Sequence, residues 1–268
     1  MYSYLDSRHQ RVKIGSHRST AKEIKIGVPQ GSVLGPLLFN IFINDLFLIN
    51  LDTEICNFAD DNTLYSCGHD LQEIVTNLEN DLSKLLEWFK SNGMVANPKK
   101  FQLMFLGLKG KKRLRLNIEG DKLPTADHVK LLGVEIDSKL TFNKHIETLC
   151  SKVNKMASAF SRMSNHISRE QALTVCNAVV LSNFNYCPLI WLFCNKGANK
   201  EIDRTHKRAL RILYKDYESS FETLLARSGS NSIHIKNIQK LMTEIYKSMN
   251  HLNLSIFFDK VTVLNMLS

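Results

Sequence analysis

The stretch Glu54-Ile55-Cys56-Asn57-Phe58-Ala59-Asp60-Asp61-Asn62-Thr63-Leu64-Tyr65 sets two adjacent carboxylates between two short apolar runs. The flanks are rich in β-branched and aromatic residues, and Asp and Asn are residues that turns select. This pattern predicts a β-hairpin whose turn is formed by Asp60-Asp61-Asn62. Such a tip either holds a metal ion through its carboxylates or is an ordinary solvated turn, and the hairpin alone leaves both interpretations open.

The composition of the whole chain is that of a globular protein with a basic surface. The 268 residues are 44% hydrophobic and 23% charged, which allows one large domain or two small ones. Lys and Arg number 35 against 26 Asp and Glu, which gives a formal net charge of +9. This charge indicates a polyanionic partner, with nucleic acid as the first expectation and an anionic membrane surface as the second.

The six cysteines contain no Cys-x-x-Cys pair and lie in apolar or helical runs. We therefore expect reduced core residues, not a zinc or disulfide framework. The N-terminus lacks the apolar segment of a signal peptide, and no run approaches the roughly 18 apolar residues of a membrane span. These features predict a soluble intracellular protein of the nucleus or cytoplasm that is not secreted and has no membrane partner.

Upstream of the hairpin, the stretch Gly27-Val28-Pro29-Gln30-Gly31-Ser32-Val33-Leu34-Gly35-Pro36 is a glycine- and proline-rich loop. Its glycines permit positive φ angles and close backbone approach to a ligand. The apolar residues at 37–46 then predict a helix, and they are too continuous for a one-sided surface helix. We expect this helix to be buried.

Downstream of the hairpin, helical and extended patterns alternate over short distances. Apolar residues recur at spacings of three and four between residues 71 and 89, which predicts an amphipathic helix that Gly93 ends. Strands are expected at 101–106, 114–118 and 129–137, with a turn at 119–121. This mixture is typical of helices that lie on one face of a sheet.

From about residue 141 the pattern is helical, so we expect one domain at 1–140 and a second at 141–268. Helices are predicted at 143–164, 169–186, 199–215, 220–227 and 233–250. The helix at 199–215 has an apolar stripe of Ile202, Ala209, Leu210 and Leu213 and a basic face of Arg204, Lys207, Arg208, Arg211 and Lys215. That face either keeps the helix soluble or contacts the phosphates of a nucleic acid.

Four blocks in the same order resemble the reverse transcriptase of a non-LTR retrotransposon of the LINE or jockey-like kind. They are the loop at 27–36, Phe58-Ala59-Asp60-Asp61, the segment 97–105, and Leu131-Leu132-Gly133-Val134-Glu135-Ile136-Asp137. The region that holds Asn185-Tyr186-Cys187, Trp191 and Lys207-Arg208 is similar to the part that follows the palm in these proteins. The resemblance therefore extends over nearly the whole chain.

The resemblance implies an α+β fold: a partial right-hand polymerase palm, with an antiparallel sheet and helices on one face, followed by an all-helical thumb-like region. It implies an RNA-directed DNA polymerase, a nucleotidyltransferase whose partners are an RNA template, a DNA primer and deoxynucleoside triphosphates. Two Mg²⁺ ions would activate the attacking oxygen and stabilise the leaving one.

The resemblance also assigns roles to individual residues. Asp60 and Asp61 would be the metal ligands. The residues beside the nucleotide and template would be Pro29, Gln30, Gly31, Phe58 and Ala59. The primer grip would be formed by Leu132, Gly133 and Val134. Lys100 would be either a proton donor to pyrophosphate or an ordinary surface lysine, and the nucleic-acid backbone contacts would be made by Arg204, Lys207, Arg208 and Arg211.

One part of the family pattern is not found. These polymerases need another Asp on a strand upstream of the glycine-rich loop, and Asp6, Asp45 and Asp52 do not match it. We therefore expect an N-terminally truncated reverse transcriptase that is inactive, or nearly so, in isolation. A nucleic-acid-binding remnant without catalysis is the alternative, and a fragment that does not accumulate as folded protein is a third possibility.

Overall fold

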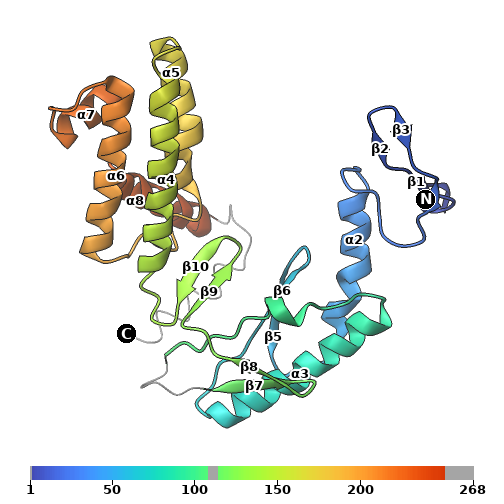
Figure 1. Ribbon diagram of the computed structural model, residues 1–268. Helices are drawn as coiled ribbons and strands as arrows, with labels where there is room; N and C mark the ends of the chain where they lie inside the picture. Colours follow the sequence, from blue (N-terminus) through green and yellow to red (C-terminus); the bar gives the residue numbers. More distant parts are fainter. Residues whose placement is uncertain (1, 108–113, 251–268) are drawn as a thin grey trace. The chain divides into compact units, whose positions relative to one another are not determined.

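A computed structural model describes residues 2–107 and 114–250, in which helices are mixed with small antiparallel sheets (Figure 1). The chain forms two compact units. Unit 1 comprises Met1–Leu103 and Arg113–Thr125, and unit 2 comprises Met104–Lys112 and Ala126–Ser268. The mixed α and β class agrees with the prediction. In the described ranges the strands pair as separate two-stranded sheets.

Unit 1 is built from short hairpins and helices, and it holds a small core whose buried residues are Ile43, Leu46 and Leu85. Its helices are α1 (Tyr2–Leu5), α2 (Gly35–Ile43), the 3-10 helix η1 (Asn44–Leu48), α3 (Leu71–Ser91) and the 3-10 helix η2 (Pro98–Lys100). Its strand pairs are β1 (His9–Gln10) with β4 (Lys22–Glu23), β2 (Lys13–Ile14) with β3 (His17–Arg18), β5 (Glu54–Phe58) with β6 (Asp61–Tyr65), and β7 (Arg115–Ile118) with β8 (Asp121–Pro124).

Helix α3 is the main support of unit 1, and its prediction is confirmed. The Asp70 carboxylate caps its first turn by accepting from the N–H of Gln72 at 2.8 Å, and Gly93 follows its end with φ +70°. Its buried Leu85 packs with Ile43 and Leu46, and partly buried residues of both hairpin strands join this cluster. The apolar face of α3 therefore carries the β5–β6 hairpin.

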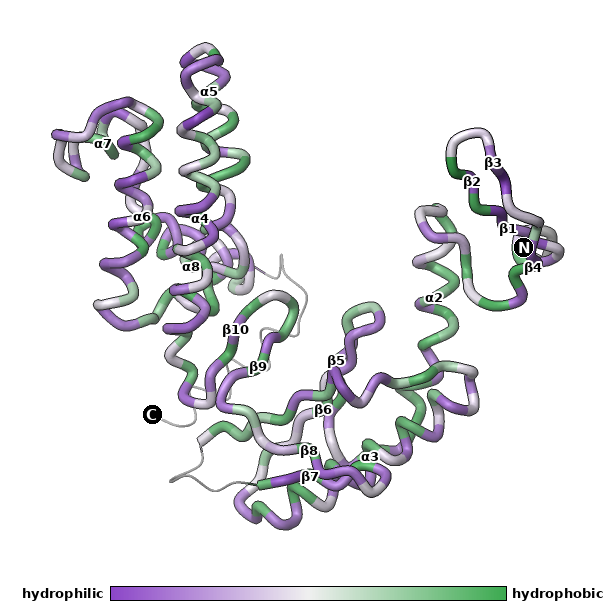
Figure 2. The backbone as a smooth tube through the Cα atoms, viewed as in Figure 1, coloured by the Kyte–Doolittle hydropathy of each residue, from purple (hydrophilic) through white to green (hydrophobic). Residues whose placement is uncertain are grey.

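The predicted burial of the 37–46 helix is wrong. Apolar residues run along α2 (Figure 2), yet the side chains of Leu37, Ile41 and Phe42 are 51%, 59% and 41% exposed. Among the residues of α2 only Gly35 and Ile43 are buried, and the described part of unit 1 leaves its other side chains exposed or half-buried. No helix in the described part of the chain combines the length and the apolar content that a membrane crossing needs.

Two strand predictions also need correction. Residues 101–106 form no strand, and only an isolated bridge joins Leu103 to Thr125. The predicted strand at 129–137 is a hairpin of β9 (His128–Leu131) and β10 (Val134–Asp137). The chain reverses at Leu132 and Gly133, which have φ values of +46° and +86°. By contrast, the expected strand at 114–118 and the turn that follows it are present as β7 and its connection to β8.

Unit 2 contains the β9–β10 hairpin and a helical bundle. The helices are α4 (Asn143–Met163), α5 (Arg169–Val175), the π-helix η3 (Cys176–Val180), the 3-10 helix η4 (Leu181–Asn185), α6 (Lys196–Tyr214), α7 (Phe221–Ser228) and α8 (Ile233–Met249). The β9–β10 hairpin belongs to the same compact unit as α4, which follows it in the chain. The N–H of Glu135 on β10 donates to Nδ1 of His145 on α4 at 3.4 Å.

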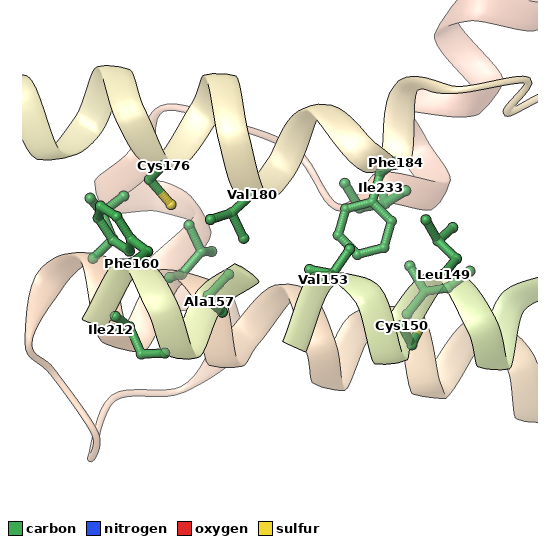
Figure 3. Packing of buried hydrophobic residues seen from close by; sticks show 14 of the residues in the cluster. Leu149, Cys150, Val153, Ala157, Phe160, Cys176, Val180, Phe184, Ile212 and Ile233 are labelled. Carbon is green, nitrogen blue, oxygen red and sulfur yellow. The ribbon is translucent and has the colours of Figure 1, made fainter. Parts of the chain in front are cut away.

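The bundle core lies between α4, the 169–185 segment and α6 (Figure 3). Val153 and Ala157 of α4 meet Val180 and Phe184 there, and the predicted apolar stripe of α6 is fully buried. Burial raises the pKa of the Cys176 thiol to about 12. Cys176 and Cys150 are both buried, so the core prediction is right for these two cysteines, but it is wrong for Cys56 and Cys67, which are exposed.

Candidate functional site

The β5–β6 hairpin ends in a two-residue turn. Phe58 pairs with Asp61, so the connecting residues are Ala59 and Asp60, and the predicted Asp60-Asp61-Asn62 turn begins one residue too late and is one residue too long. Ala59 adopts φ +54°, a left-handed conformation that residues other than glycine rarely adopt. Asp61 is instead the first residue of β6, directly across from Phe58. The two carboxylates therefore start from backbone positions that the turn and the ladder fix.

Two asparagines fix the polar end of this hairpin. Asn57 and Asn62 are cross-strand partners, and the Asn57 side-chain amide donates to Oδ1 of Asn62 at 2.8 Å and to the carbonyl of Ala59 at 2.7 Å. The Asn62 amide in turn reaches the Asp60 carbonyl at 3.5 Å. These bonds hold the turn from the inside, while the side chains of Asp60, Asp61 and Phe58 remain exposed.

The other end of the hairpin is anchored through a buried carboxylate on α3. Asp81 accepts from the N–H of Thr53 at 2.8 Å and from the Lys84 ammonium at 2.8 Å. Burial of Asp81 would raise the pKa of its carboxyl, but the hydrogen bonds from Lys84 and Thr53 outweigh burial and hold that pKa below its usual value. The charged form of Asp81 thus ties the residue before β5 to α3.

The glycine-rich loop is organised by a serine that the sequence did not single out. The Ser32 hydroxyl donates to the Pro29 carbonyl at 2.7 Å and accepts from the Gly35 N–H at 3.1 Å and from the Tyr4 hydroxyl at 2.6 Å. A Cβ at Gly35 would lie 2.9 Å from the Ser32 oxygen, so a side chain there would displace this hydroxyl from its bonds. Gly31 adopts φ +77° and is exposed, as is Gln30.

Lys100 ends the short helix η2, which the Asn97 side chain caps by accepting from the N–H of Lys99 at 3.1 Å. The Lys100 side chain is exposed. In the described residues no hydrogen bond joins residues 58–62, at the tip of the β5–β6 hairpin, to the glycine-rich loop or to Lys100. Unit 1 therefore holds all three candidate segments without bonding them to each other.

The primer-grip candidates lie in unit 2, at the turn of the β9–β10 hairpin. Leu132 and Gly133 form the turn, whereas Val134 begins β10 and is buried. The base of the hairpin is fixed by buried Asp137, which accepts from the N–H groups of Phe142 at 2.7 Å and Thr141 at 3.0 Å. Although burial opposes it, this set of donors lowers the pKa of the Asp137 carboxyl.

The four basic candidates on α6 differ in their surroundings. The Arg208 guanidinium bonds across to α4, donating to Oδ1 of Asn154 at 2.7 Å and to Oγ of Ser158 at 2.9 Å. Arg204 is exposed, while Lys207 and Arg211 are half-buried. Arg204 is therefore the candidate best placed to meet solvent or a phosphate, and Arg208 also packs α6 on α4.

The carboxylates of Asp60 and Asp61 fit Mg²⁺ in chemical type, since this ion prefers oxygen ligands and usually binds one or two carboxylates together with substrate phosphates. Within residues 2–107 and 114–250, no group of three or more His, Cys, Asp or Glu side chains is placed to hold a metal ion. At this turn Asp60 and Asp61 are the carboxylates that could hold such an ion.

Sequence reasoning missed three residues that hold the candidate site: Asn57, Ser32 and Asp81. The hairpin register would have placed Asn57 opposite Asn62 had the turn been predicted as the two residues Ala59 and Asp60. Asp81 lies on the apolar face of α3 between Leu78 and Leu85, where a carboxylate requires a buried partner. Ser32 bonds to Pro29 and Gly35, three residues away on either side, so a serine at this spacing in a turn was a local signal that could have found it, whereas its bond with Tyr4 has no such signal.

The family model and the relatives that match this chain agree with one another. Residues 2–136 match the family model described as reverse transcriptase (RNA-dependent DNA polymerase). The chain is 27% identical over 221 residues to a probable RNA-directed DNA polymerase from transposon X-element of Drosophila melanogaster, a match that covers 79% of this chain and 24% of that protein.

A second relative is the RNA-directed DNA polymerase from mobile element jockey of Drosophila melanogaster. It is 27% identical over 154 residues, which cover 55% of this chain and 17% of the relative. The chain thus spans about a quarter or less of the length of these relatives. No solved structure is significantly similar.

Proposed function

Because the chain belongs to the reverse transcriptase (RNA-dependent DNA polymerase) family, we propose that it contributes the carboxylate hairpin of an RNA-directed DNA polymerase of a non-LTR retrotransposon. The observation that carries this proposal is the β5–β6 turn, where two exposed adjacent carboxylates stand on a backbone held by Asn57. Unit 1 would be part of the palm, and the helices of unit 2 would be the thumb-like region.

The proposed chemistry is transfer of a nucleotide to a primer hydroxyl with loss of pyrophosphate. Asp60 and Asp61 would hold Mg²⁺, which supplies positive charge to the phosphates when it is bound. Carboxylates on a rigid hairpin suit this role, since a site held within about 0.5 Å of its productive geometry needs fixed supports. The Asn57 amide and the Asp81 anchor would be those supports.

Each remaining candidate would contact one of the substrates. Gln30 and Gly31 would lie against the nucleotide and template, because the exposed Gly31 backbone carries no side chain to block approach. Lys100 would approach the departing pyrophosphate as a cation. The RNA template and DNA primer would meet the Leu132–Gly133 turn and the basic face of α6, in keeping with a net charge of +9.

We further propose that these 268 residues alone have little polymerase activity. In the described residues no third acidic or metal-binding side chain joins Asp60 and Asp61. A two-metal centre with too few carboxylates provides less stabilisation for the charge that develops during phosphoryl transfer. The nucleic-acid and nucleotide contacts would remain.

Primer extension by the purified chain tests this proposal, with Mg²⁺, an RNA template, an annealed DNA primer and labelled nucleotides. We expect trace incorporation that Asp60→Asn removes, together with primer-template binding that weakens steeply with salt. Robust incorporation that depends on Asp60 would contradict the low activity while supporting the polymerase function. Failure to bind primer-template at low salt would contradict the function itself.

A further inference from the structure

The turn between β9 and β10 has an unusual backbone for its sequence. Leu131 pairs with Val134, so Leu132 and Gly133 are the two connecting residues, and both have positive φ. Hairpin turns of this kind favour Asn-Gly or Asp-Gly, because a branched side chain such as leucine crowds the left-handed conformation. A strained residue of this sort persists only where its surroundings impose the conformation.

Those surroundings are provided by Tyr186, which lies 54 residues further along the chain. Its hydroxyl donates a hydrogen bond to the main-chain carbonyl of Leu132. Its ring also covers Gly133, where an added Cβ would lie 3.5 Å from Cε1 and 3.6 Å from the hydroxyl oxygen of the tyrosine. One aromatic side chain therefore contacts both residues of the turn.

Tyr186 is itself fixed by the core of unit 2. Trp191, which is 1% exposed, donates from Nε1 to the Tyr186 carbonyl at 3.3 Å. The following residue, Cys187, adopts φ +44°, so the chain turns sharply after the tyrosine. The Tyr186 side chain is nevertheless 52% exposed, and its ring reaches from the bundle surface to the hairpin.

The β9–β10 hairpin is therefore supported both at its base and at its turn. Asp137 and His145 hold its base on α4, and Tyr186 holds its tip. Leu132 presents an apolar side chain that is 41% exposed at that tip. An exposed apolar group on a doubly anchored, strained turn is suited to pack against a flat apolar partner, such as the sugar and base of a nucleotide.

We propose that Tyr186 is a positioning residue that holds the Leu132–Gly133 turn against the 3′ end of a primer, a role that rests on the polymerase function proposed above. The tyrosine would set the position of Leu132 without itself touching the reacting atoms. Loss of its hydroxyl would loosen the turn, while the phosphate contacts made elsewhere in the chain would be unchanged.

The experiment compares the wild-type chain with Tyr186→Phe, and with Tyr246→Phe as the matched control. Tyr246 is an exposed tyrosine on α8, and the same hydroxyl is removed there. Fluorescence anisotropy measures affinity for a primer-template with a recessed 3′ end and for a blunt duplex of equal length. Amide hydrogen exchange at residues 131–134 is measured without nucleic acid.

We expect Tyr186→Phe to reduce the preference for the recessed end by roughly three- to tenfold, in line with the loss of one hydrogen bond. Affinity for the blunt duplex should stay within about twofold, and exchange should accelerate at 131–134 only. Gly133→Ala, whose Cβ meets the Tyr186 ring at positive φ, should reproduce both effects. Tyr246→Phe should change neither quantity.

Unchanged exchange and unchanged end preference in Tyr186→Phe would overturn the proposal, as would a wild-type chain that binds duplex without any preference for a recessed end. A faster exchange with full end preference would show a merely structural contact and would also overturn it. If the wild-type chain binds no nucleic acid, the polymerase function fails, and that result is distinct from these.

Discussion

The side-chain amide of Asn57 donates a 2.8 Å hydrogen bond to the amide oxygen of Asn62, its partner across the β5–β6 hairpin. The same amide reaches the Ala59 carbonyl at 2.7 Å. One side chain thus links both strands to the turn that carries Asp60. The carboxylates of the proposed metal site depend on this bond for their position, because their own side chains are exposed.

Replacement of Asn57 by Ala should therefore loosen the turn. We expect unfolding of unit 1 to become easier by about 1–2 kcal/mol, since two hydrogen bonds are lost and the Asn62 amide oxygen loses its partner. Exchange of the amides at 58–62 should accelerate. The matched control is Asn40→Ala on exposed α2, which should leave those amides unchanged. Equal exchange in the two variants would contradict the support role of Asn57.

The left-handed backbone at Ala59 predicts a substitution that stabilises unit 1, whereas Asn57→Ala destabilises it. Ala59→Gly should stabilise unit 1 by roughly 0.5–1 kcal/mol, because glycine adopts positive φ without the steric cost that alanine has. Ala59→Val should destabilise it, since a β-branched residue fits this conformation poorly. Chemical denaturation followed by Trp88 fluorescence measures both, in a Trp191→Phe background. A destabilised glycine variant would rule out positive φ at residue 59.

Much of the helical structure could be predicted because its signals are local. The spacing of apolar residues in α3 and α6 marks their buried faces, and Asp70 and Gly93 mark the ends of α3. The β9–β10 hairpin was missed because its turn places a leucine at positive φ, where hairpins normally show Asn or Asp. The bond from Tyr186 to this turn has no local signal at all, since it joins residues far apart in the chain.

Part of the candidate site was also predictable, because its signal is local. The residue types at Asp60 and Asp61 carry a chemical meaning that the sequence displays directly. Their supports are less visible, because the bond of Asp81 with Thr53 and the bond of Ser32 with Tyr4 each join residues far apart in the chain. The exposure of α2 was missed since an apolar run predicts burial only if some other part of the protein covers it, and the local sequence does not contain that information.

Asp81 makes unit 1 sensitive to acid. Its folded pKa is lowered, so its contribution to stability is fully present above the unfolded value near 3.8 and is lost as pH falls through the folded value. Asp81→Asn should destabilise unit 1 by about 2 kcal/mol at pH 7, because the charged hydrogen bonds to Lys84 and Thr53 are weakened. Its unfolding energy should also depend less on pH below 4. Denaturation followed by Trp88 fluorescence measures this unfolding free energy as a function of pH. A pH dependence identical to that of the wild-type chain would contradict the prediction.

His206 makes unit 2 sensitive to acid over a different range. The ring is fully buried between Phe184 and Phe221, and burial, aided by the nearby Lys236 charge, lowers its pKa to about 4. The unfolded state therefore takes up a proton near pH 6.5 while the folded state does not. Stability should fall by roughly 3 kcal/mol as pH drops from 6.5 to 4.

The test for His206 follows Trp191 fluorescence in a Trp88→Phe background. His206→Gln should remove most of the stability loss between pH 6.5 and 4, since glutamine does not titrate. His166→Gln, at an exposed histidine of the same unit, should retain that loss. Identical pH profiles for the two variants would exclude His206 as the acid-sensitive group.

Arg204 and Arg208 should separate nucleic-acid binding from packing. Arg204→Gln should reduce the slope of log affinity against log salt by about one, the loss expected for one phosphate contact, with little effect on stability. Arg208→Gln should instead lower the stability of unit 2 by about 1 kcal/mol, because its bonds to Asn154 and Ser158 are lost. Salt titrations and denaturation of both variants measure the difference, and a stability loss confined to Arg204→Gln would reverse the assignment.

The central claim, that Asp60 and Asp61 hold a divalent metal for nucleotide transfer, is tested most directly by Mn²⁺ broadening of backbone amide NMR signals in the presence of primer-template and a nucleoside triphosphate. We predict selective broadening at residues 59–61 that Asp60→Asn abolishes and Asp45→Asn, at an exposed carboxylate of the same unit, preserves. Broadening that misses residues 59–61, or that survives Asp60→Asn unchanged, would contradict the claim.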